Sequence, residues 1–251
     1  MRWLITLLLL VFFQWYSYQA LKTAISNRWI LYGYVFFTVI IVGNLLFYTL
    51  ILERNTTNEP RLMYAIGFFL SLLIFQLLVS VILLAEDVFR IPQALYSFLK
   101  RVPEQTQFIP SRRKIISQIA LGLASIPFAS LLYGMYRGKY NYKVLSYSLE
   151  FEDLPDAFDG FKITQISDIH SGSFDNQTKV QYGVDLVNQQ KSDLVLFTGD
   201  LVNNRADEIK PWIKIFNKIK AEFGVFSILG NHDYGDYMRW ESPAAKRKNM
   251  K

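Results

Sequence analysis

The sequence reads Ser167-Asp168-Ile169-His170 at the end of one short apolar run, Thr198-Gly199-Asp200 at the end of the next, and Gly230-Asn231-His232-Asp233 at the end of a third. The runs themselves are rich in residues that favour β-strands. Carboxylate, carboxamide and imidazole groups are common ligands of divalent metal ions. Such groups at three neighbouring strand ends are what a hydrolase with two metal ions needs, so these strings decide how the second half of the chain is interpreted.

Composition divides the chain into two classes of protein. Of its 251 residues, 51% are hydrophobic and 16% aromatic, and nearly all of this excess precedes residue 136. The net charge of +6 comes mostly from basic clusters beside apolar runs, which in a membrane protein set orientation, so we expect no nucleic-acid partner. The chain has no cysteine, which excludes disulfides and thiolate metal sites.

The first half predicts four membrane-spanning helices. Its four charge-free segments each meet the roughly 20-residue length that crosses a bilayer. They are Trp3–Leu21, Trp29–Leu52, Leu62–Ala85 and Ile115–Tyr136. Buried helices of a soluble core normally carry a polar face, which these segments lack. The first segment lacks a clear cleavage site before Leu21, so a retained helix is favoured over a cleaved signal peptide.

Basic residues predict the orientation of these helices. The third connection is far richer in them than the second, which places the third connection in the cytoplasm and both termini outside. The basic residues of the third connection are Arg90, Lys100, Arg101, Arg112, Arg113 and Lys114, and those of the second are Arg54 and Arg61. Arg137, Lys139 and Lys143 weigh against this orientation. We expect a multi-pass cell-membrane protein whose globular part is extracytoplasmic.

Residues 91–102 carry an apolar stripe at helical spacing within this third connection. Two interpretations stay open. The segment is either a helix on the inner membrane surface or an ordinary helical connector.

The chain is expected to have three parts, a transmembrane region at 1–136, a linker at 137–143 and a globular domain at 144–251. Short alternating apolar runs in the globular part predict the order β-β-α-β-α-β. The predicted elements are strand Tyr142–Phe151, strand Phe161–Ile169, helix Gln177–Gln190, strand Asp193–Leu201, helix Ala206–Ala221 and strand Gly224–Leu229. Pro211 falls in the first turns of the second helix, where proline is tolerated. The last three strands should be parallel and joined by right-handed crossovers.

The three strings would meet at the carboxyl ends of these parallel strands, where such sheets bind ligands. The spacing of Asp168 and His170 can turn both side chains toward one ion. A carboxylate at Asp200 can bridge two ions roughly 3.5–4 Å apart. Asn231 offers a neutral oxygen, and His232 can act as a proton donor or as a cation beside a phosphate. Asp233 would either orient His232 through a hydrogen bond or stabilise the turn.

Each string alone has an ordinary structural explanation, because glycine followed by aspartate or asparagine is common in turns. Three strings in successive β-α units are specific. Ser167-Asp168-Ile169-His170, Thr198-Gly199-Asp200-Leu201-Val202 and Leu229-Gly230-Asn231-His232-Asp233 resemble the first three signature blocks of the calcineurin-like metallophosphoesterases. The membrane-anchored bacterial branch is the most similar, and the resemblance covers residues 144–240.

The resemblance implies a site for two divalent metal ions, such as Mn, Fe or Zn. Asp168 and His170 would hold the first ion, Asp200 would bridge both, and Asn231 would hold the second. His232 would be catalytic, assisting the scissile phosphate or its leaving group. A metal-bridging hydroxide would hydrolyse a phosphomonoester or phosphodiester.

The chain departs from the family pattern after these blocks. The family supplies three further histidines, whereas no histidine follows His232. The second ion would keep only Asp200 and Asn231, which is too few for a tight site. The family fold is a two-sheet α/β sandwich, and this chain has strands for one sheet. We therefore expect the N-terminal half of the sandwich, with the inner face of the sheet bare.

The last residues predict a helix start, because Ser242 and Pro243 are a helix cap and a proline at the first helical position. A helix that begins there and stops at Lys251 favours a chain cut short. A basic tail that contacts a membrane or nucleic acid is the alternative.

Two functional hypotheses follow. The first is a membrane-anchored, metal-dependent phosphoesterase that lies against the lipid bilayer. Its substrate would be a phosphate ester, and lipid-linked phosphate groups are within reach of an anchored site, although no residue specifies them. The second is a catalytically incomplete membrane protein whose truncated domain only binds metal or a partner.

Overall fold

A computed structural model describes residues 2–50, 60–100 and 110–250. The chain forms two compact units, one made mainly of residues up to Tyr136 and the other mainly of residues from Arg137 onward. Each unit is described by itself.

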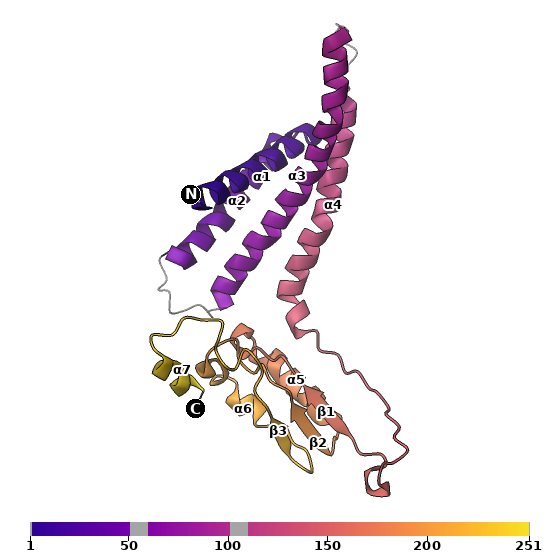
Figure 1. Ribbon diagram of the computed structural model, residues 1–251, viewed down its shortest axis with the longest axis vertical. Helices are drawn as coiled ribbons and strands as arrows, with labels where there is room; N and C mark the ends of the chain where they lie inside the picture. The colour runs from indigo at the N-terminus through magenta and orange to yellow at the C-terminus, as the bar shows by residue number, and fades with distance from the viewer. Residues whose placement is uncertain (1, 51–59, 101–109, 251) are drawn as a thin grey trace. The chain divides into compact units, whose positions relative to one another are not determined.

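The first unit consists of four long helices (Figure 1). They are α1 (Arg2–Ala24), α2 (Arg28–Leu50), α3 (Pro60–Lys100) and α4 (Pro110–Tyr136). In the described part of the chain, four helical segments are long and apolar enough to cross a membrane. These are Leu4–Ala24, Arg28–Leu50, Pro60–Pro92 and Arg112–Tyr136. The four predicted segments are confirmed, except that Ile51 and Leu52 lie outside the described residues.

Three alanines, one valine and one leucine form the centre of this helical unit. Ala20 of α1, Val79 and Leu83 of α3, and Ala120 and Ala124 of α4 are buried together. Small side chains let helix backbones approach closely, which is how helices associate inside a bilayer. Many large apolar side chains of α1 and α2 are exposed instead, among them Phe36 and Phe37. A lipid-facing surface has this character.

Two groups of polar side chains join the helices to one another. The carboxamide of Gln76 donates to Gln14 and, at 3.0 Å, to the Tyr34 hydroxyl, which joins α1, α2 and α3. Arg113 of α4 forms ion pairs with Glu86 and Asp87 of α3. Pairing removes most of the cost of placing polar groups in an apolar environment.

Helix α3 is longer than the sequence predicts. It continues without interruption from Pro60 to Lys100, although Pro92 lies inside it. Residues 91–100 of the predicted apolar stripe therefore extend the third helix, and Val102 lies outside the described residues.

The second unit contains a three-stranded parallel sheet. Strands β1 (Ile163–Ile166), β2 (Leu194–Phe197) and β3 (Val225–Ser227) are paired in the order β1-β2-β3. Ile163 is paired with Leu194, and Val195 is paired with Val225. The predicted parallel strands are confirmed, although each is shorter than its apolar run.

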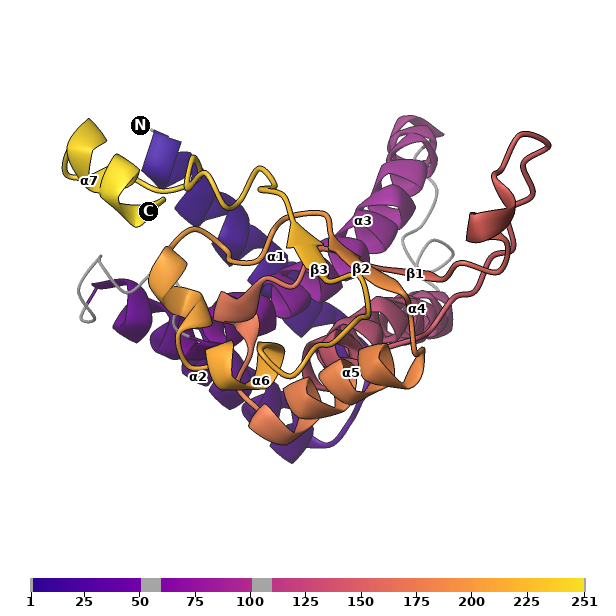
Figure 2. The same ribbon diagram turned by 90° about the horizontal axis from the view of Figure 1, so that it is seen from below.

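Helices cover one face of this sheet. Helices α5 (Gln177–Gln189) and α6 (Ile213–Phe216) lie on the same side of the strands (Figure 2). Their core consists of Tyr140, Val180, Val184, Trp212 and Ile215. Phe226 is paired with Leu196 and so lies on the face opposite the buried Val195, and it is 59% exposed, as expected for a sheet with one bare face.

Two predicted elements are wrong. Residues 142–151, all described, form no strand, and Leu145 and Tyr147 are exposed, since an apolar alternation forms a strand only when a neighbouring strand takes its hydrogen bonds. The helix predicted over Ala206–Ala221 is instead the 3-10 helix η5 (Ala206–Ile209) followed by α6. Pro211 lies between them, because proline has no N–H to donate and its ring clashes with the preceding turn.

Short helical turns complete the second unit. They are η2 (Gly138–Tyr140), η3 (Asp156–Phe158) and η4 (Ser171–Ser173). The predicted helix start at Ser242 is confirmed, because the Ser242 hydroxyl accepts a hydrogen bond from the Ala245 amide at the start of α7 (Pro243–Asn249).

The residues that follow α4 pack into the second unit. The Tyr140 hydroxyl donates to Asp175 at 2.8 Å and accepts from the Asp175 and Asn176 amides. The Tyr142 ring lies against Gly183 of α5, where a β-carbon would come within 3.0 Å of it. Burial, with a smaller contribution from Tyr140, raises the pKa of Tyr142 from 10.0 to about 12.

This pKa predicts a loss of stability in alkali. Below pH 10 Tyr142 is neutral in both the folded and unfolded states, so its full contribution to the free energy of unfolding is present. As the pH rises from 10 through 12, the unfolded state gains by ionising first, so the free energy of unfolding should fall. Denaturant unfolding of the detergent-solubilised chain should show a smaller fall for Tyr142→Phe. Tyr147→Phe, at a residue 79% exposed, is the matched control and should behave as wild type.

Candidate metal centre

The loops after β1 and β2 bring His170 close to two predicted carboxylate ligands. Nε2 of His170 lies 3.9 Å from Oδ1 of Asp168 and 3.9 Å from Oδ2 of Asp200. The Asp168 side chain is 67% exposed, whereas that of Asp200 is 11% exposed. One carboxylate therefore faces solvent at the rim and the other lies at the base.

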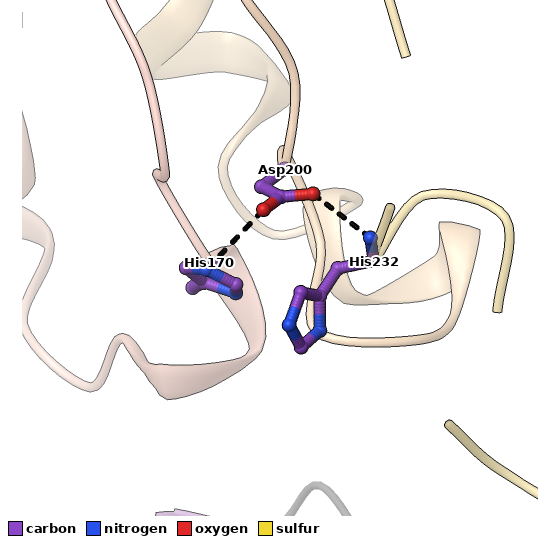
Figure 3. A group of neighbouring side chains, drawn as sticks. All are labelled: His170, Asp200 and His232. Atoms are coloured by element: carbon purple, nitrogen blue, oxygen red, sulfur yellow. Dashed lines mark hydrogen bonds and ion pairs between the residues drawn. The ribbon is translucent and has the colours of Figure 1, made fainter. Parts of the chain in front are cut away.

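The loop after β3 brings His232 to the same place. Ligand atoms of His170, Asp200 and His232 all lie within 4.8 Å of one another, with Asp200 between the two histidines (Figure 3). The His232 amide donates to Oδ1 of Asp200 at 2.8 Å, which fixes the carboxylate. The two imidazole rings meet edge to face, with their centroids 4.6 Å apart.

A backbone carbonyl orients the His232 ring. Nδ1 of His232 lies 2.8 Å from the carbonyl oxygen of Asn203. A carbonyl can only accept, so Nδ1 carries the proton and Nε2 is the free nitrogen of the neutral ring. One of the two roles expected for Asp233 is that of hydrogen-bond partner to His232. The Asn203 carbonyl takes this place, because the carboxylate of Asp233 accepts from backbone amides instead.

Asn231 lies at the exposed edge of the cluster. Its amide nitrogen donates to the Tyr237 hydroxyl at 2.8 Å. The carboxamide oxygen is the other end of the same planar group, so this bond orients it as well.

The candidate ligands have unusual backbone angles. Four non-glycine residues of the described chain have positive φ, and three of them are Asp168 (53°), His170 (47°) and Asp200 (60°). A left-handed conformation costs roughly 1–2 kcal/mol for such residues. Strain of this kind persists where the surrounding structure enforces it and is concentrated at functional sites.

Hydrogen bonds between the loops enforce these angles. The amides of Asp168 and His170 donate to the carbonyls of Gly199 and Asp200, at 3.1 and 3.0 Å. The ladder that joins β1 to β2 therefore continues beyond the strands and carries the two loops as a pair.

The glycines of two strings allow the loops to approach each other. A β-carbon on Gly199 would lie 2.9 Å from the carbonyl carbon of Leu229 and would overlap Gly230. Gly199 also has a φ of +103°, which L side chains rarely adopt. The glycine before Asp200 thus serves close approach as well as the sharp turn.

The buried carboxylate of Asp233 holds the loops after β2 and β3 together. Oδ2 accepts from the amides of Asp200 at 2.7 Å and Gly230 at 2.8 Å. Oδ1 accepts from the amides of Leu201 at 2.8 Å and Val202 at 3.2 Å. Of the two roles considered for this residue, the structure shows the support of the turn.

A second carboxylate, that of Glu208, organises the next stretch of chain. It accepts from the amides of Asn203, Asn204 and Arg205. Burial raises the pKa of Glu208, against the opposing effect of these backbone hydrogen bonds. The Asn203 carbonyl that orients His232 is thus part of a capped turn.

The donor set fits a divalent cation. Ligand atoms about 2.1 Å from one ion lie at most about 4.2 Å apart, close to the separations around His170. Two imidazoles with carboxylates suit Zn, Fe or Mn. Asp168, His170 and Asp200 could hold one ion, and Asp200 with Asn231 a second, with His232 beside them.

Several contributors carry no clear signal in the sequence. The Asn203 carbonyl is a backbone atom, present at every position. Tyr237 follows the third string, and its ring stacks on His232 with centroids 4.5 Å apart and planes inclined by 31°. The glycine at position 235 is the sequence feature that could have indicated a turn before Tyr237. Its φ of +65° shows that the chain does turn there.

Comparison with known proteins adds to this geometry. Residues 1–139 match a family model described as "Probable Calcineurin-like phosphoesterase, transmembrane domain", and residues 161–250 match one described as "Calcineurin-like phosphoesterase". No solved structure matches the chain.

Similar curated proteins carry related names. The chain is 32% identical to an uncharacterized metallophosphoesterase of Bacillus subtilis, over 42% of the chain and 37% of that protein. It is 31% identical to an uncharacterized metallophosphoesterase of Helicobacter pylori, over 52% of the chain and 35% of that protein. A Danio rerio transmembrane protein with a metallophosphoesterase domain is 29% identical, over 41% of the chain and 24% of that protein. The chain thus spans less than half the length of these relatives.

Asp233→Asn should loosen the loops around the metal centre. A carboxamide offers one oxygen and turns an NH₂ group toward two backbone donors, and each unsatisfied donor costs about 1–3 kcal/mol. Amide hydrogen exchange should therefore accelerate at residues 200–202 and 230. Asp236→Asn, in the same turn and paired with Lys246, is the matched control. Unchanged protection at residues 200–202 in the Asp233 variant would contradict this role.

Proposed function

Because the chain belongs to the calcineurin-like phosphoesterases, we propose that it is a membrane-anchored, metal-dependent hydrolase of phosphate esters. The observation that carries this proposal is the convergence of His170, Asp200 and His232 at the carboxyl ends of parallel strands. Strained backbone at His170 and Asp200 supports the same interpretation.

The proposed ligand roles follow from the donor geometry. Asp168 and His170 would hold a first ion, Asp200 would bridge two ions, and Asn231 would contribute to the second. Asp200 suits a shared position because its Oδ2 faces His170 while its Oδ1 is held by the His232 amide. The second ion has fewer protein donors here and should bind more weakly.

When bound, divalent ions would supply Lewis-acid chemistry, polarising the phosphoryl oxygens and lowering the pKa of water. The protein would supply orientation and a proton. With Nδ1 donating to the Asn203 carbonyl, His232 carries a second proton on Nε2 only as the imidazolium. In that state Nε2 can donate to a phosphoryl oxygen or protonate the leaving alcohol.

The membrane region bears on substrate and location. The proposed partners are the lipid bilayer and a phosphate-ester substrate, with lipid-linked phosphate groups within reach of an anchored domain. The excess of basic residues at the C-terminal end of α3, the N-terminal end of α4 and the connection between them favours an extracytoplasmic globular domain. The placement of basic clusters beside the spans argues against a nucleic-acid partner.

The alternative function is a metal-binding or partner-binding domain without turnover. It is favoured by the small donor set of the second ion, for which this chain offers Asp200 and the exposed Asn231. This function also predicts metal binding, so hydrolysis separates the two proposals.

Hydrolysis of a phosphodiester and a phosphomonoester by the solubilised chain with added Mn²⁺ tests the proposal. Asp200→Asn removes the shared carboxylate and should lower the rate about 10²-fold or more, since metal ions supply several kcal/mol of charge stabilisation. Asp207→Asn is the control, because Asp207 pairs with Arg205 outside the cluster. A folded, Mn²⁺-binding wild-type chain without turnover would favour the non-catalytic function.

The side of the membrane on which the globular domain lies can be tested by cysteine labelling, because the chain has no native cysteine that would react. Ser148→Cys, at an exposed residue of the globular unit, should react with a membrane-impermeant maleimide in intact cells. Thr106→Cys, between α3 and α4, should react only after the membrane is permeabilised. The opposite pattern would place the globular domain in the cytoplasm.

A further inference from the structure

We propose that Tyr237 is a positioning residue of the second metal site, which orients the Asn231 carboxamide and covers one face of the His232 ring. This inference rests on the proposed function. Tyr237 contacts Asn231 through its hydroxyl and His232 through its ring.

The hydroxyl contact determines which end of the carboxamide is free. The Asn231 nitrogen donates to the Tyr237 oxygen at 2.8 Å. A carboxamide coordinates a cation through its oxygen, which requires the NH₂ group to face elsewhere. A phenolic oxygen that accepts from this NH₂ group stabilises that orientation, and a cation on the carboxamide oxygen would strengthen the N–H donor in turn.

The ring contact restrains His232 from a second side. The Tyr237 ring stacks on the imidazole at 4.5 Å, and the His170 ring meets that imidazole edge to face. The Asn203 carbonyl holds its Nδ1. These contacts leave the imidazole little freedom to rotate.

The turn that carries Tyr237 is itself well supported. The Gly235 amide donates to the His232 carbonyl at 2.9 Å, and the Trp240 indole donates to the Gly235 carbonyl at 2.7 Å. A β-carbon on Gly235 would lie 2.9 Å from the Asn204 carbonyl oxygen, so only glycine lets the turn pack this closely. Tyr237 is 64% exposed, yet its backbone is held beside the site.

Mn²⁺ binding to the full chain in detergent, measured by electron paramagnetic resonance of the free ion, tests this role. Tyr237→Phe keeps the ring and removes the hydroxyl, and it should weaken the lower-affinity Mn²⁺ site about tenfold, as loss of an outer hydrogen bond to a ligand does. The higher-affinity site should change less than twofold. Tyr234→Phe, in the same turn, is the matched control and should match wild type.

A double-mutant cycle separates orientation from general support. Both oxygens of a carboxylate are equivalent, so Asn231→Asp needs no orienting partner. Tyr237→Phe should therefore weaken the lower-affinity site in the wild-type background but not in the Asn231→Asp background. A merely structural role predicts the same loss in both backgrounds and would overturn the inference.

The outcomes also separate this inference from the proposed function. Equal Mn²⁺ binding by wild type and Tyr237→Phe would overturn the positioning role and leave the metal centre intact. A wild-type chain that binds no Mn²⁺ would overturn both.

Discussion

The carboxylate of Asp233 is the constraint on which the candidate site depends. It is buried and accepts hydrogen bonds from backbone amides of two loops, those of Gly230, Asp200, Leu201 and Val202. Hydrogen bonds to a charged group contribute about 1.5–3 kcal/mol each, enough to offset the strain at the ligands. Without this carboxylate, the loops after β2 and β3 would lose a main link, and the bonds of His232 to Asp200 and Asn203 would have to hold His232 in place.

The same arrangement explains why the ligands have strained backbones. Asp168, His170 and Asp200 adopt left-handed conformations that turn successive side chains toward one point. The amides and carbonyls freed by these turns bond across the loops, from Asp168 to Gly199 and from His170 to Asp200. The hydrogen bonds between the loops therefore maintain the strained backbone of the ligands, and together they hold the donor atoms in place before an ion binds. Such preorganisation is what a hydrolytic metal site requires.

Much of this organisation could be predicted from the sequence, because it depends on local pattern. Long charge-free runs predicted four helices, and apolar runs that end in Asp, Asn and His predicted parallel strands with ligands at their ends. The predictions that failed concern segments whose structure depends on contacts with other parts of the chain. Residues 142–151 have the alternation of a strand but pair with no strand of the described chain, and Pro211 divides a segment with helical periodicity. The Asn203 carbonyl and the Tyr237 ring act through contacts that no spacing rule indicates.

X-ray absorption spectroscopy of the Zn²⁺-loaded full chain tests the central claim most directly, because it reports the ligands of the ion itself. The account predicts a first shell of nitrogen and oxygen atoms at about 2.0–2.1 Å, with the outer-shell scattering of imidazole. That imidazole signal should decrease in His170→Ala. A first shell of oxygen atoms alone, with no imidazole scattering in the wild-type protein, would contradict a metal centre built on His170 and Asp200.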